Sequence, residues 1–324
     1  MARLDRLMTG KVIAQLGAAL GRQFAYNLLH AVSQLDEATL QRELARLVDA
    51  ELVYQRGLPP HATYMFKHAL IQDAAYTSLL KSTRQQYHQR IAQVLETQFL
   101  ETIAGQPELL AHHFTEAGLN EQAVHYWHKA GQSAVQRSAH VEAIHHLRTG
   151  LALLQTLPET LERTQREVDL LIALGASLLA TKGTGAPEVG QIYTCAQHLC
   201  THLDNPEQLF PVLRGRWNYY HVRAEYQTAY ALGEQLLTLA QQVQDAAMVV
   251  AAHRALGSTL LFTGEPAAAH MHFAQGIARY DPQQHRTAVF LYGDDAGVVC
   301  HALDAWALWY LGYPDQGLAQ SQPR

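Results

Sequence analysis

The sequence predicts a nearly all-α protein in which a small domain of helices and a β-hairpin precedes a long array of helical repeats. Only 16% of the 324 residues are charged and 48% are hydrophobic, mostly Ala and Leu, as in a folded, helix-rich chain. Apolar residues recur at helical spacing along most of the chain. Runs of β-branched and aromatic residues that predict strands occur only between residues 52 and 66.

The first 66 residues predict three helices and then two strands. Helical spacing predicts a first helix over residues 4–20, and "FAYNLLHAV" (24–32) predicts a second. A third helix follows Ser33, with Asp36 placed to cap its N-terminus. The strands "LVYQ" and "TYMF" are separated by "RGLPPHA", whose glycine and prolines exclude a helix. Three helices followed by a β-hairpin form the pattern of a winged helix.

From residue 68 onward, helical segments separated by short loops share a signature. A small residue after a turn is followed, in the clearest cases four positions later, by an aromatic residue or Leu. In the clearest case Gly257 is followed by Ala269, Phe273 and Pro282, an order that resembles the tetratricopeptide pattern. Spacings of about 40 and 48 residues between small positions exceed the usual 34, so the repeats are irregular. We expect the small residues to lie where two helices approach closely: Ala123, Ala143, Ala229, Ala269 and Gly317.

These patterns divide the chain into three parts. We expect a winged-helix domain at residues 1–66, linking helices at 67–100 and a tetratricopeptide-like α-solenoid at 101–324. The stretch from Asp281 to Cys300 is too long for a plain turn, and the sequence leaves open whether it is a lip on a groove or a structural plug. Both ends of the sequence fall inside helical patterns, so we expect a piece of a longer protein.

The bulk composition excludes several classes of protein. The net charge of −5 and the isoelectric point near 6.4 give no general electrostatic attraction to nucleic acid. Three cysteines are too few for a disulfide framework and fit a reducing compartment. The N-terminus lacks the apolar run of a signal peptide, and no segment reaches the roughly 18 apolar residues of a membrane span. We therefore expect a cytoplasmic protein without a membrane partner.

Four motifs follow the winged-helix pattern in order: "FKHALIQDAAYTSLL", "RQQYHQRIAQVLE", "QPELLAHHFTEAG" and "AVHYWHKAGQSA". In this order and spacing they resemble the C-terminal half of bacterial signal transduction ATPases with numerous domains, the STAND class. The chain is similar to the predicted ATPases of this class that often follow an adenylate/guanylate cyclase domain, and the similarity covers nearly the whole chain. The resemblance implies an upstream ATPase core as a partner, and ATP or ADP as the ligand of a full-length parent.

The chain itself lacks the elements of catalysis. A P-loop needs a Gly-rich turn followed by Lys and Ser or Thr, whereas "GAALGR" (17–22) places Arg22 where the Lys would be. No GxSxG or similar nucleophile signature occurs either. We therefore expect neither enzymatic activity nor a bound cofactor in this chain alone.

The junction after the second strand, "YMFKHALIQDAA", carries the most specific candidate site. In related switch ATPases a Met-His-Asp-Leu stretch at this place contributes a histidine that faces bound ADP. The resemblance assigns this position to His68 and the leucine to Leu70, while Ala69 replaces the aspartate. It implies that His68, with Lys67, senses the nucleotide in a full-length parent. A histidine at a helix N-terminus suits an anion on physical grounds, and the alternative is that it only caps and packs the junction.

The inner face of a helical solenoid is lined mainly by the first helix of each pair and is the usual partner groove. Counting from Gly257 and its equivalent positions places seven residues on this face. They are Arg214, Asn218, His221, Arg254, Ser258, Trp306 and Trp309. Arginines with aromatic residues suit a carboxylate-bearing or extended peptide. For the two tryptophans, the alternative is packing against a following helix.

Two other kinds of site are disfavoured by the sequence. Structural zinc sites usually draw on two separated ligand pairs, whereas the tightest His and Cys group lies on a single repeat helix. The third helix, which would contact DNA, has five acidic residues against two arginines and would repel phosphate. We therefore expect no metal site and no nucleic-acid partner. The residues of the His and Cys group are Cys195, His198, Cys200 and His202.

The sequence thus predicts a regulatory sensor region. The solenoid binds a protein or small-molecule signal, and the winged helix relays its occupancy through His68 to a nucleotide-bound ATPase core that is absent from this chain. Two other functions stay open at this point. One is a tetratricopeptide scaffold or adaptor without nucleotide contact, and the other is a transcriptional regulator that binds DNA through the winged helix.

Overall fold

The computed structural model describes residues 9–203, 205–283 and 295–321. Within these ranges the chain forms seventeen helices and one three-stranded sheet, so the predicted nearly all-α fold is confirmed. The chain divides into two compact units, residues 1–130 and 131–324. None of these helices is long and apolar enough to cross a membrane. The start of the predicted first helix and the middle of the predicted insertion lie outside the described residues.

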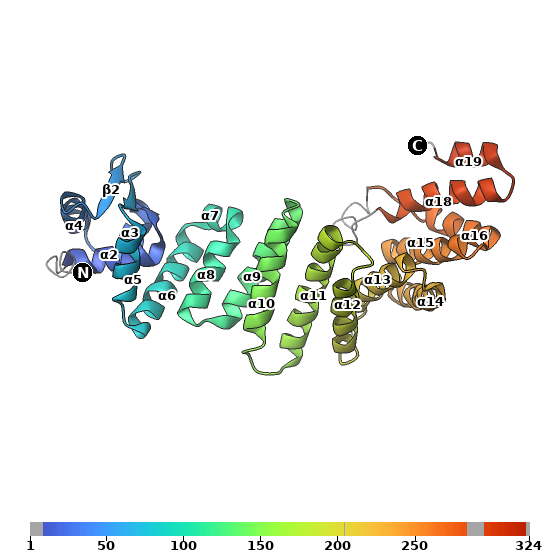
Figure 1. Ribbon diagram of the computed structural model, residues 1–324, viewed down its shortest axis with the longest axis horizontal. Helices are drawn as coiled ribbons and strands as arrows, with labels where there is room; N and C mark the ends of the chain where they lie inside the picture. Colours follow the sequence, from blue (N-terminus) through green and yellow to red (C-terminus); the bar gives the residue numbers. More distant parts are fainter. Residues whose placement is uncertain (1–8, 204, 284–294, 322–324) are drawn as a thin grey trace. The chain divides into compact units, whose positions relative to one another are not determined.

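The N-terminal unit begins with three helices and an antiparallel sheet (Figure 1). The elements are α2 (Thr9–Leu20), β1 (Gln23–Ala25), α3 (Tyr26–Ser33), α4 (Glu37–Asp49), β2 (Val53–Arg56) and β3 (Thr63–Phe66). β3 is the central strand and pairs antiparallel with both β1 and β2, which confirms the predicted hairpin. The predicted cap is also confirmed, because the Asp36 carboxylate accepts a hydrogen bond of 2.9 Å from the Thr39 amide.

The strand β1 is an element that the sequence did not predict. The expected helix over 24–32 was wrong at its start, since Phe24 lies in β1 and the helix begins at Tyr26. Phe24 joins the sheet because its ring packs 5.9 Å from the Tyr64 ring and 5.8 Å from the Phe66 ring, measured between centroids. All three rings are buried. A strand of three residues is too short to show the alternation of apolar and polar residues that predicts a strand. The helical spacing of the residues that follow β1 therefore dominated the prediction.

Five more helices follow the sheet. They are α5 (Ala69–Thr77), α6 (Lys81–Gln98), α7 (Leu100–Gly105), α8 (Pro107–Ala117) and α9 (Asn120–Gln136). α6 packs along α8 and also contacts α2 and α3, so these helices belong to the same compact unit as the sheet. The division between the two units falls inside α9.

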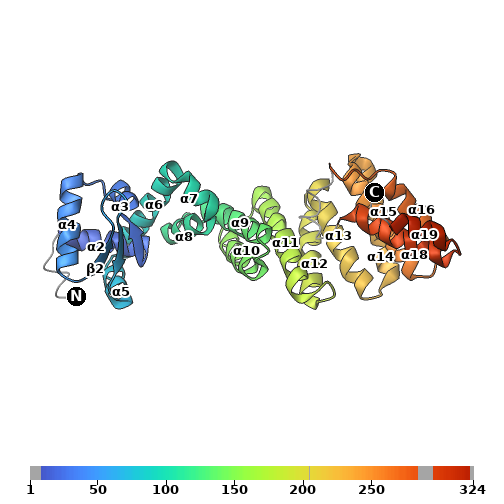
Figure 2. The ribbon, with the colours of Figure 1, turned by 90° about the horizontal axis from the view of Figure 1, so that it is seen from above.

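The C-terminal unit is an α-solenoid in which each helix packs against the next along the chain (Figures 1 and 2). Its helices are α10 (His140–Leu154), α11 (Leu161–Lys182), α12 (Pro187–Cys200), α13 (Pro206–Val222), α14 (Tyr226–Val243), α15 (Ala246–Phe262), α16 (Pro266–Ile277), α18 (Ala296–Tyr310) and α19 (Pro314–Ser321). The first helices of successive pairs also stack, α15 on α13 and α18 on α15. This stacking brings side chains from different repeats onto one surface.

The small residues predicted at close helix contacts are all buried, which confirms that prediction. Gly317 shows the constraint directly, because a Cβ atom there would lie 2.8 Å from the Ala305 carbonyl oxygen. At Gly257 an added Cβ atom would lie 2.6 Å from the ring of Phe273. Larger residues at either position would force the paired helices apart.

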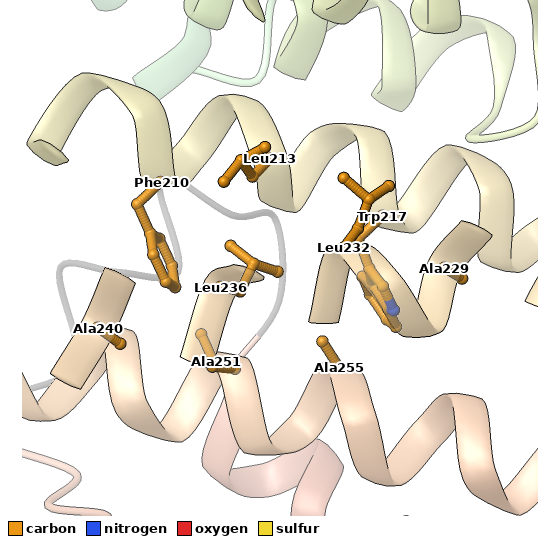
Figure 3. Packing of buried hydrophobic residues seen from close by; sticks show 10 residues of the cluster. Phe210, Leu213, Trp217, Ala229, Leu232, Leu236, Ala240, Ala251 and Ala255 are labelled. Atoms are coloured by element: carbon orange, nitrogen blue, oxygen red, sulfur yellow. The ribbon is translucent and has the colours of Figure 1, made fainter. Parts of the chain in front are cut away.

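The helices α13, α14 and α15 enclose the hydrophobic cluster shown in Figure 3. The cluster includes Trp217 of α13, which is buried and whose indole Nε1 donates a hydrogen bond of 3.0 Å to Thr259 Oγ1 on α15. Ala229 of α14 and Ala255 of α15 belong to the same cluster and lie beside the indole, so their small side chains leave room for it. Burying this one ring therefore fixes the spacing of three helices.

Gly17, within the stretch "GAALGR", packs against Phe24, and a Cβ atom there would lie 2.8 Å from the Phe24 ring. We predict that Gly17→Ala lowers the free energy of unfolding by about 1–3 kcal/mol, because the Phe24 ring, which packs on Tyr64, must shift to make room for the methyl group. Chemical denaturation measures the loss. Gly105→Ala is the matched control, since nothing lies within 4 Å of a Cβ atom at that position. Equal losses in the two variants would contradict the prediction.

Candidate functional site

His68 is the residue that immediately precedes α5, as the sequence indicated. Its backbone is extended, with φ −135° and ψ 144°, and its side chain makes no capping hydrogen bond. The side chain is exposed. The imidazole is therefore open to solvent beside the first backbone N–H groups of α5.

Lys67 contacts residues of its own unit. Its Nζ lies 3.1 Å from Glu51 Oε2 and 5.7 Å from the centroid of the Tyr54 ring. Its backbone N–H donates a hydrogen bond of 3.0 Å to the Leu52 carbonyl. A ligand that recruits the Lys67 ammonium group would have to compete with Glu51, whereas His68 has no such competitor among these contacts.

A polar network of four side chains joins α5, α6 and α8. The Tyr76 hydroxyl lies 2.9 Å from His88 Nε2 and donates a hydrogen bond of 3.1 Å to Glu116 Oε2. His88 Nδ1 in turn lies 2.8 Å from His113 Nδ1. Both imidazoles are buried. The network therefore ties the C-terminal part of α5 to two helices that follow it.

The carboxylate of Glu116 sets the direction of every hydrogen bond in this network. Since the Tyr76 proton goes to Glu116, the Tyr76 oxygen accepts the proton of His88 Nε2–H. His88 Nδ1 is then the acceptor, and His113 Nδ1–H is the donor. Each imidazole carries one proton in this arrangement. A second proton on His88 would place its Nδ1–H opposite the Nδ1–H of His113, and the hydrogen bond between the two rings would be lost.

Burial favours the neutral form of both histidines. Burial, together with repulsion from His112 and Arg84, lowers the pKa of His88 from 6.5 to about 4, and the Glu116 carboxylate opposes this shift. Burial and repulsion from His88 and His112 lower the pKa of His113 to about 3. The network is therefore uncharged at its two histidines at pH 7.

A second candidate site surrounds the indole of Trp217 on α13 and α15. The guanidinium carbon of Arg214 lies 5.7 Å from the Trp217 ring centroid, and that of Arg254 lies 4.8 Å from it. The His221 ring stacks on the same indole, with centroids 4.9 Å apart and planes 20° apart. Three of the predicted groove residues therefore share one aromatic centre. We call Arg214, Trp217, His221 and Arg254 the arginine cluster.

The arginine cluster combines positive charge with neutral polar groups. Burial and the nearby Arg254 guanidinium lower the pKa of His221 to about 4, so the ring is neutral at pH 7. His221 Nδ1 is buried and has no hydrogen-bond partner among the described residues. The same holds for the hydroxyl of Ser258, one helical turn beyond Arg254. Buried polar atoms without a partner call for an explanation, and a binding role is one.

The other predicted groove residues are not part of the arginine cluster. Asn218 is half-buried on α13. Trp306 and Trp309 are exposed on α18 and line a hollow with residues of α16 and α19. None of the residues that line this hollow belongs to α13 or α15. The predicted groove residues therefore fall into two groups on different helices.

The residues that organise both candidate sites were not predicted from the sequence. Trp217 lies twelve residues before Ala229, as Gly257 lies twelve before Ala269, so counting repeats could have found it. His113 and Glu116 left no such signal, because their partners are 25 and 40 residues away on other helices.

The predicted Cys and His group lies at the end of α12, with His202 just beyond the last helical residue, Cys200. Cys195 is exposed and Cys200 is buried, and the rings of His198 and His202 lie 5.9 Å apart. Throughout residues 9–203, 205–283 and 295–321, no group of three or more His, Cys, Asp or Glu side chains is suited to hold a metal ion.

No family model matches this chain. An uncharacterised protein of Rhizobium meliloti (strain 1021) is 28% identical over 224 residues, which are 67% of this chain and 21% of that protein. The chain therefore spans about a fifth of the length of this curated relative.

A similar solved structure agrees with the helical-repeat fold. A Rap protein complexed with competence and sporulation factor is 13% identical, with a TM-score of 0.50 over 96% of this chain and 74% of that chain. This likeness supports a tetratricopeptide-like solenoid and concerns the fold alone. A STAND protein with a tetratricopeptide repeat sensor from Pyrococcus horikoshii is 8% identical, with a TM-score of 0.49 over 96% of this chain and 56% of that chain.

We predict that the protein loses stability as the pH falls from about 6.5 to 4. Histidines of the unfolded chain bind protons in this range, whereas buried histidines with lowered pKa values do not, so protonation favours the unfolded state. For His88, a pKa lowered from 6.5 to about 4 corresponds to on the order of 3 kcal/mol. Urea denaturation at a series of pH values measures the loss.

A pair of variants separates His88 from the other histidines. His88→Gln should give a flatter dependence of stability on pH than the wild type, because one depressed pKa is removed. His61→Gln, at an exposed position, should leave the dependence unchanged. The account of the buried pair is wrong if His88→Gln and the wild type lose stability in parallel.

Proposed function

We propose that this chain is the regulatory region of a signal-transducing ATPase. In this proposal the solenoid binds a peptide signal, and the N-terminal unit relays its occupancy to a nucleotide-bound ATPase core outside this chain. The arginine cluster is the observation that carries the proposal, because two guanidinium groups from successive first helices meet on one indole ring.

The chemistry of the arginine cluster favours the carboxylate of an extended peptide. Guanidinium groups bind carboxylates through paired N–H donors. Arg254, which is partly exposed, would contact the carboxylate, and the buried Arg214 adds positive charge at the same ring. The Rap protein with a similar fold is itself complexed with competence and sporulation factor, and we propose that this solenoid also holds a ligand.

An aromatic rim beside the arginine cluster would hold an apolar side chain of the peptide. The His221 ring lies 5.3 Å from the Phe262 ring and 5.7 Å from the Tyr226 ring, and the last two stack at 6.4 Å. Phe262 is exposed and can contact a ligand directly. Aromatic residues next to arginine are typical of binding surfaces in which a few contacts supply most of the affinity.

The helix α5 provides a route from the solenoid to the nucleotide. His68 stands exposed at its N-terminus, and Tyr76 near its C-terminus is bound to His88 and Glu116. A displacement of α8 would therefore act on Tyr76 and, through a helix of nine residues, on His68. We propose that His68 faces the nucleotide of the ATPase core and that Lys67 positions the strand before it.

We also propose that residues 1–66 form a winged helix, followed by linking helices at 67–100 and the solenoid at 101–324. The order helix, strand, helix, helix, strand, strand, with β3 in the centre, supports this. Both arginines of α4 lie against Glu43, with N–O distances of 3.4 Å for Arg42 and 2.8 Å for Arg46. This pairing disfavours phosphate contacts, so we propose that α4 packs on the ATPase core rather than on DNA.

We predict that peptides with a free C-terminal carboxylate bind at least about tenfold more tightly than the same peptides with a C-terminal amide, because the amide cannot make charge-assisted hydrogen bonds. A library of labelled, N-acetylated pentapeptides, screened in both forms by fluorescence anisotropy, measures the difference. Arg254→Leu should abolish the preference for the carboxylate. Arg166→Leu, which removes a partly exposed arginine of α11, should leave it intact.

Equal binding of the two forms by the wild type would contradict the role of the arginine cluster. Equal effects of the Arg254 and Arg166 substitutions would contradict it as well. Failure of every peptide to bind would favour a scaffold that recognises folded partners.

A further inference from the structure

The aromatic rim consists of three rings that lie at nearly equal distances from one another. The centroid of the His221 ring lies 5.3 Å from that of Phe262 and 5.7 Å from that of Tyr226, and the last two lie 6.4 Å apart. The planes of Phe262 and Tyr226 are within 17° of parallel, whereas the His221 plane makes angles of 78° with Phe262 and 61° with Tyr226. Two nearly parallel rings therefore stand beside a third that is turned across them.

The ends of three helices hold the aromatic rim in place. Tyr226 is the first residue of α14, Phe262 is the last residue of α15, and His221 is the last but one of α13. In the turn between α13 and α14, the Ala224 N–H donates a hydrogen bond of 3.0 Å to the His221 carbonyl. The His221 ring also stacks on the Trp217 indole. The rim is therefore formed before any ligand arrives.

The aromatic rim is accessible at Phe262. This ring is 52% exposed although it packs on two other rings, and His221 and Tyr226 are half-buried. Trp217, behind His221, is buried. A ligand side chain that enters beside Phe262 therefore contacts the rim and not the indole behind it.

An aromatic side chain gains more from this site than an aliphatic one of equal size. Ring faces carry partial negative charge and ring edges partial positive charge, so aromatic pairs prefer offset or edge-to-face arrangements. Because the planes within the rim are crossed, a ligand ring can lie offset over one ring and edge-on to another. Such a pair strengthens binding by about two- to tenfold beyond the effect of the buried apolar area.

The charge beside the aromatic rim disfavours a cationic ligand. Three neighbouring rings can also bind a methylated ammonium group. Burial and the Arg254 guanidinium, however, lower the pKa of His221. The positive charge that disfavours a proton on His221 also disfavours a cation at the same ring. The rim is therefore suited to a neutral aromatic side chain.

The spacing along α15 relates the aromatic rim to the carboxylate. Arg254 and Phe262 are eight residues apart, which corresponds to about 12 Å along a helix axis. Both side chains face α13, since the Arg254 guanidinium carbon lies 4.8 Å from the Trp217 centroid and Phe262 contacts His221. An extended peptide advances about 3.3 Å per residue. With its carboxylate at Arg254, the peptide therefore reaches Phe262 three or four residues before its last residue.

We propose that the peptide signal carries an aromatic side chain three or four residues before its C-terminal carboxylate, and that His221, Tyr226 and Phe262 select this side chain. The inference rests on the proposed function, because it assumes that the carboxylate lies at Arg254. It extends that function by naming the class of peptide and the residues that determine its specificity.

A positional scan of peptides tests the proposal on the whole chain. Acetylated heptapeptides of alanine and serine with a free C-terminal carboxylate carry one phenylalanine, placed in turn at each position before the last residue. Calorimetry measures their affinities without a label, because an aromatic dye would compete for the rim. We predict the tightest binding with phenylalanine three or four residues before the last. The C-terminal amide of the best peptide provides the comparison that tests the carboxylate.

Cyclohexylalanine separates ring electrostatics from apolar burial. It has nearly the size of phenylalanine but no aromatic ring, so at the best position it should bind about two- to tenfold more weakly. Phe262→Leu should remove this difference between the two peptides. Tyr54→Leu, at a ring of the N-terminal unit that is 51% exposed, is the matched control and should leave the difference unchanged. Circular dichroism checks that both variants are folded.

The outcomes distinguish this inference from the proposed function. A preference for the carboxylate with no preference for phenylalanine at either position would overturn the inference and leave the proposed function in place. Equal binding of the phenylalanine and cyclohexylalanine peptides, or equal effects of Phe262→Leu and Tyr54→Leu, would overturn it as well. Equal binding of the carboxylate and amide forms, or no binding of any peptide, would contradict both.

Discussion

The burial of Trp217 among α13, α14 and α15 is the interaction on which the candidate peptide site depends. The indole occupies the space left by small residues of α14 and α15, and its hydrogen bond to Thr259 fixes how α15 lies along α13. Only in this arrangement can Arg214 and Arg254, from different repeats, reach one ring. If α15 were displaced by one residue along α13, the hydrogen bond between Trp217 and Thr259 would be lost. The two guanidinium groups would then no longer lie near the same ring.

Features that depend on neighbouring residues could be predicted from the sequence. The Asp36 cap, the hairpin and the buried small residues of the repeats are examples, because each follows from local chemistry or from counting repeats. The strand β1 could not be predicted, since Phe24 adopts it only to pack on rings about 40 residues later. Arg214, His221 and Arg254 were placed on the groove by counting, but the ring that gathers them was missed.

Paired histidines join neighbouring helices at two places in the described residues. His88 and His113 join α6 to α8, and His253 Nδ1 lies 3.1 Å from His272 Nδ1 between α15 and α16. Burial, with repulsion from His272 and Arg279, lowers the pKa of His253 to about 4, and burial also lowers the pKa of His272. Such a tie joins helices through hydrogen bonds without the desolvation cost of a buried charge. In the N-terminal unit it connects α5, and hence His68, to α8.

Calorimetry of ADP binding tests the central claim most directly, on this chain and on a longer form that also carries the ATPase core. The account predicts that ADP binds only the longer form and that His68→Leu weakens this binding, because His68 would no longer contact the nucleotide. Binding to the longer form that is unaffected by His68→Leu would contradict the relay through α5. Absence of ADP binding in both forms would contradict the nucleotide switch itself and leave a peptide-binding adaptor.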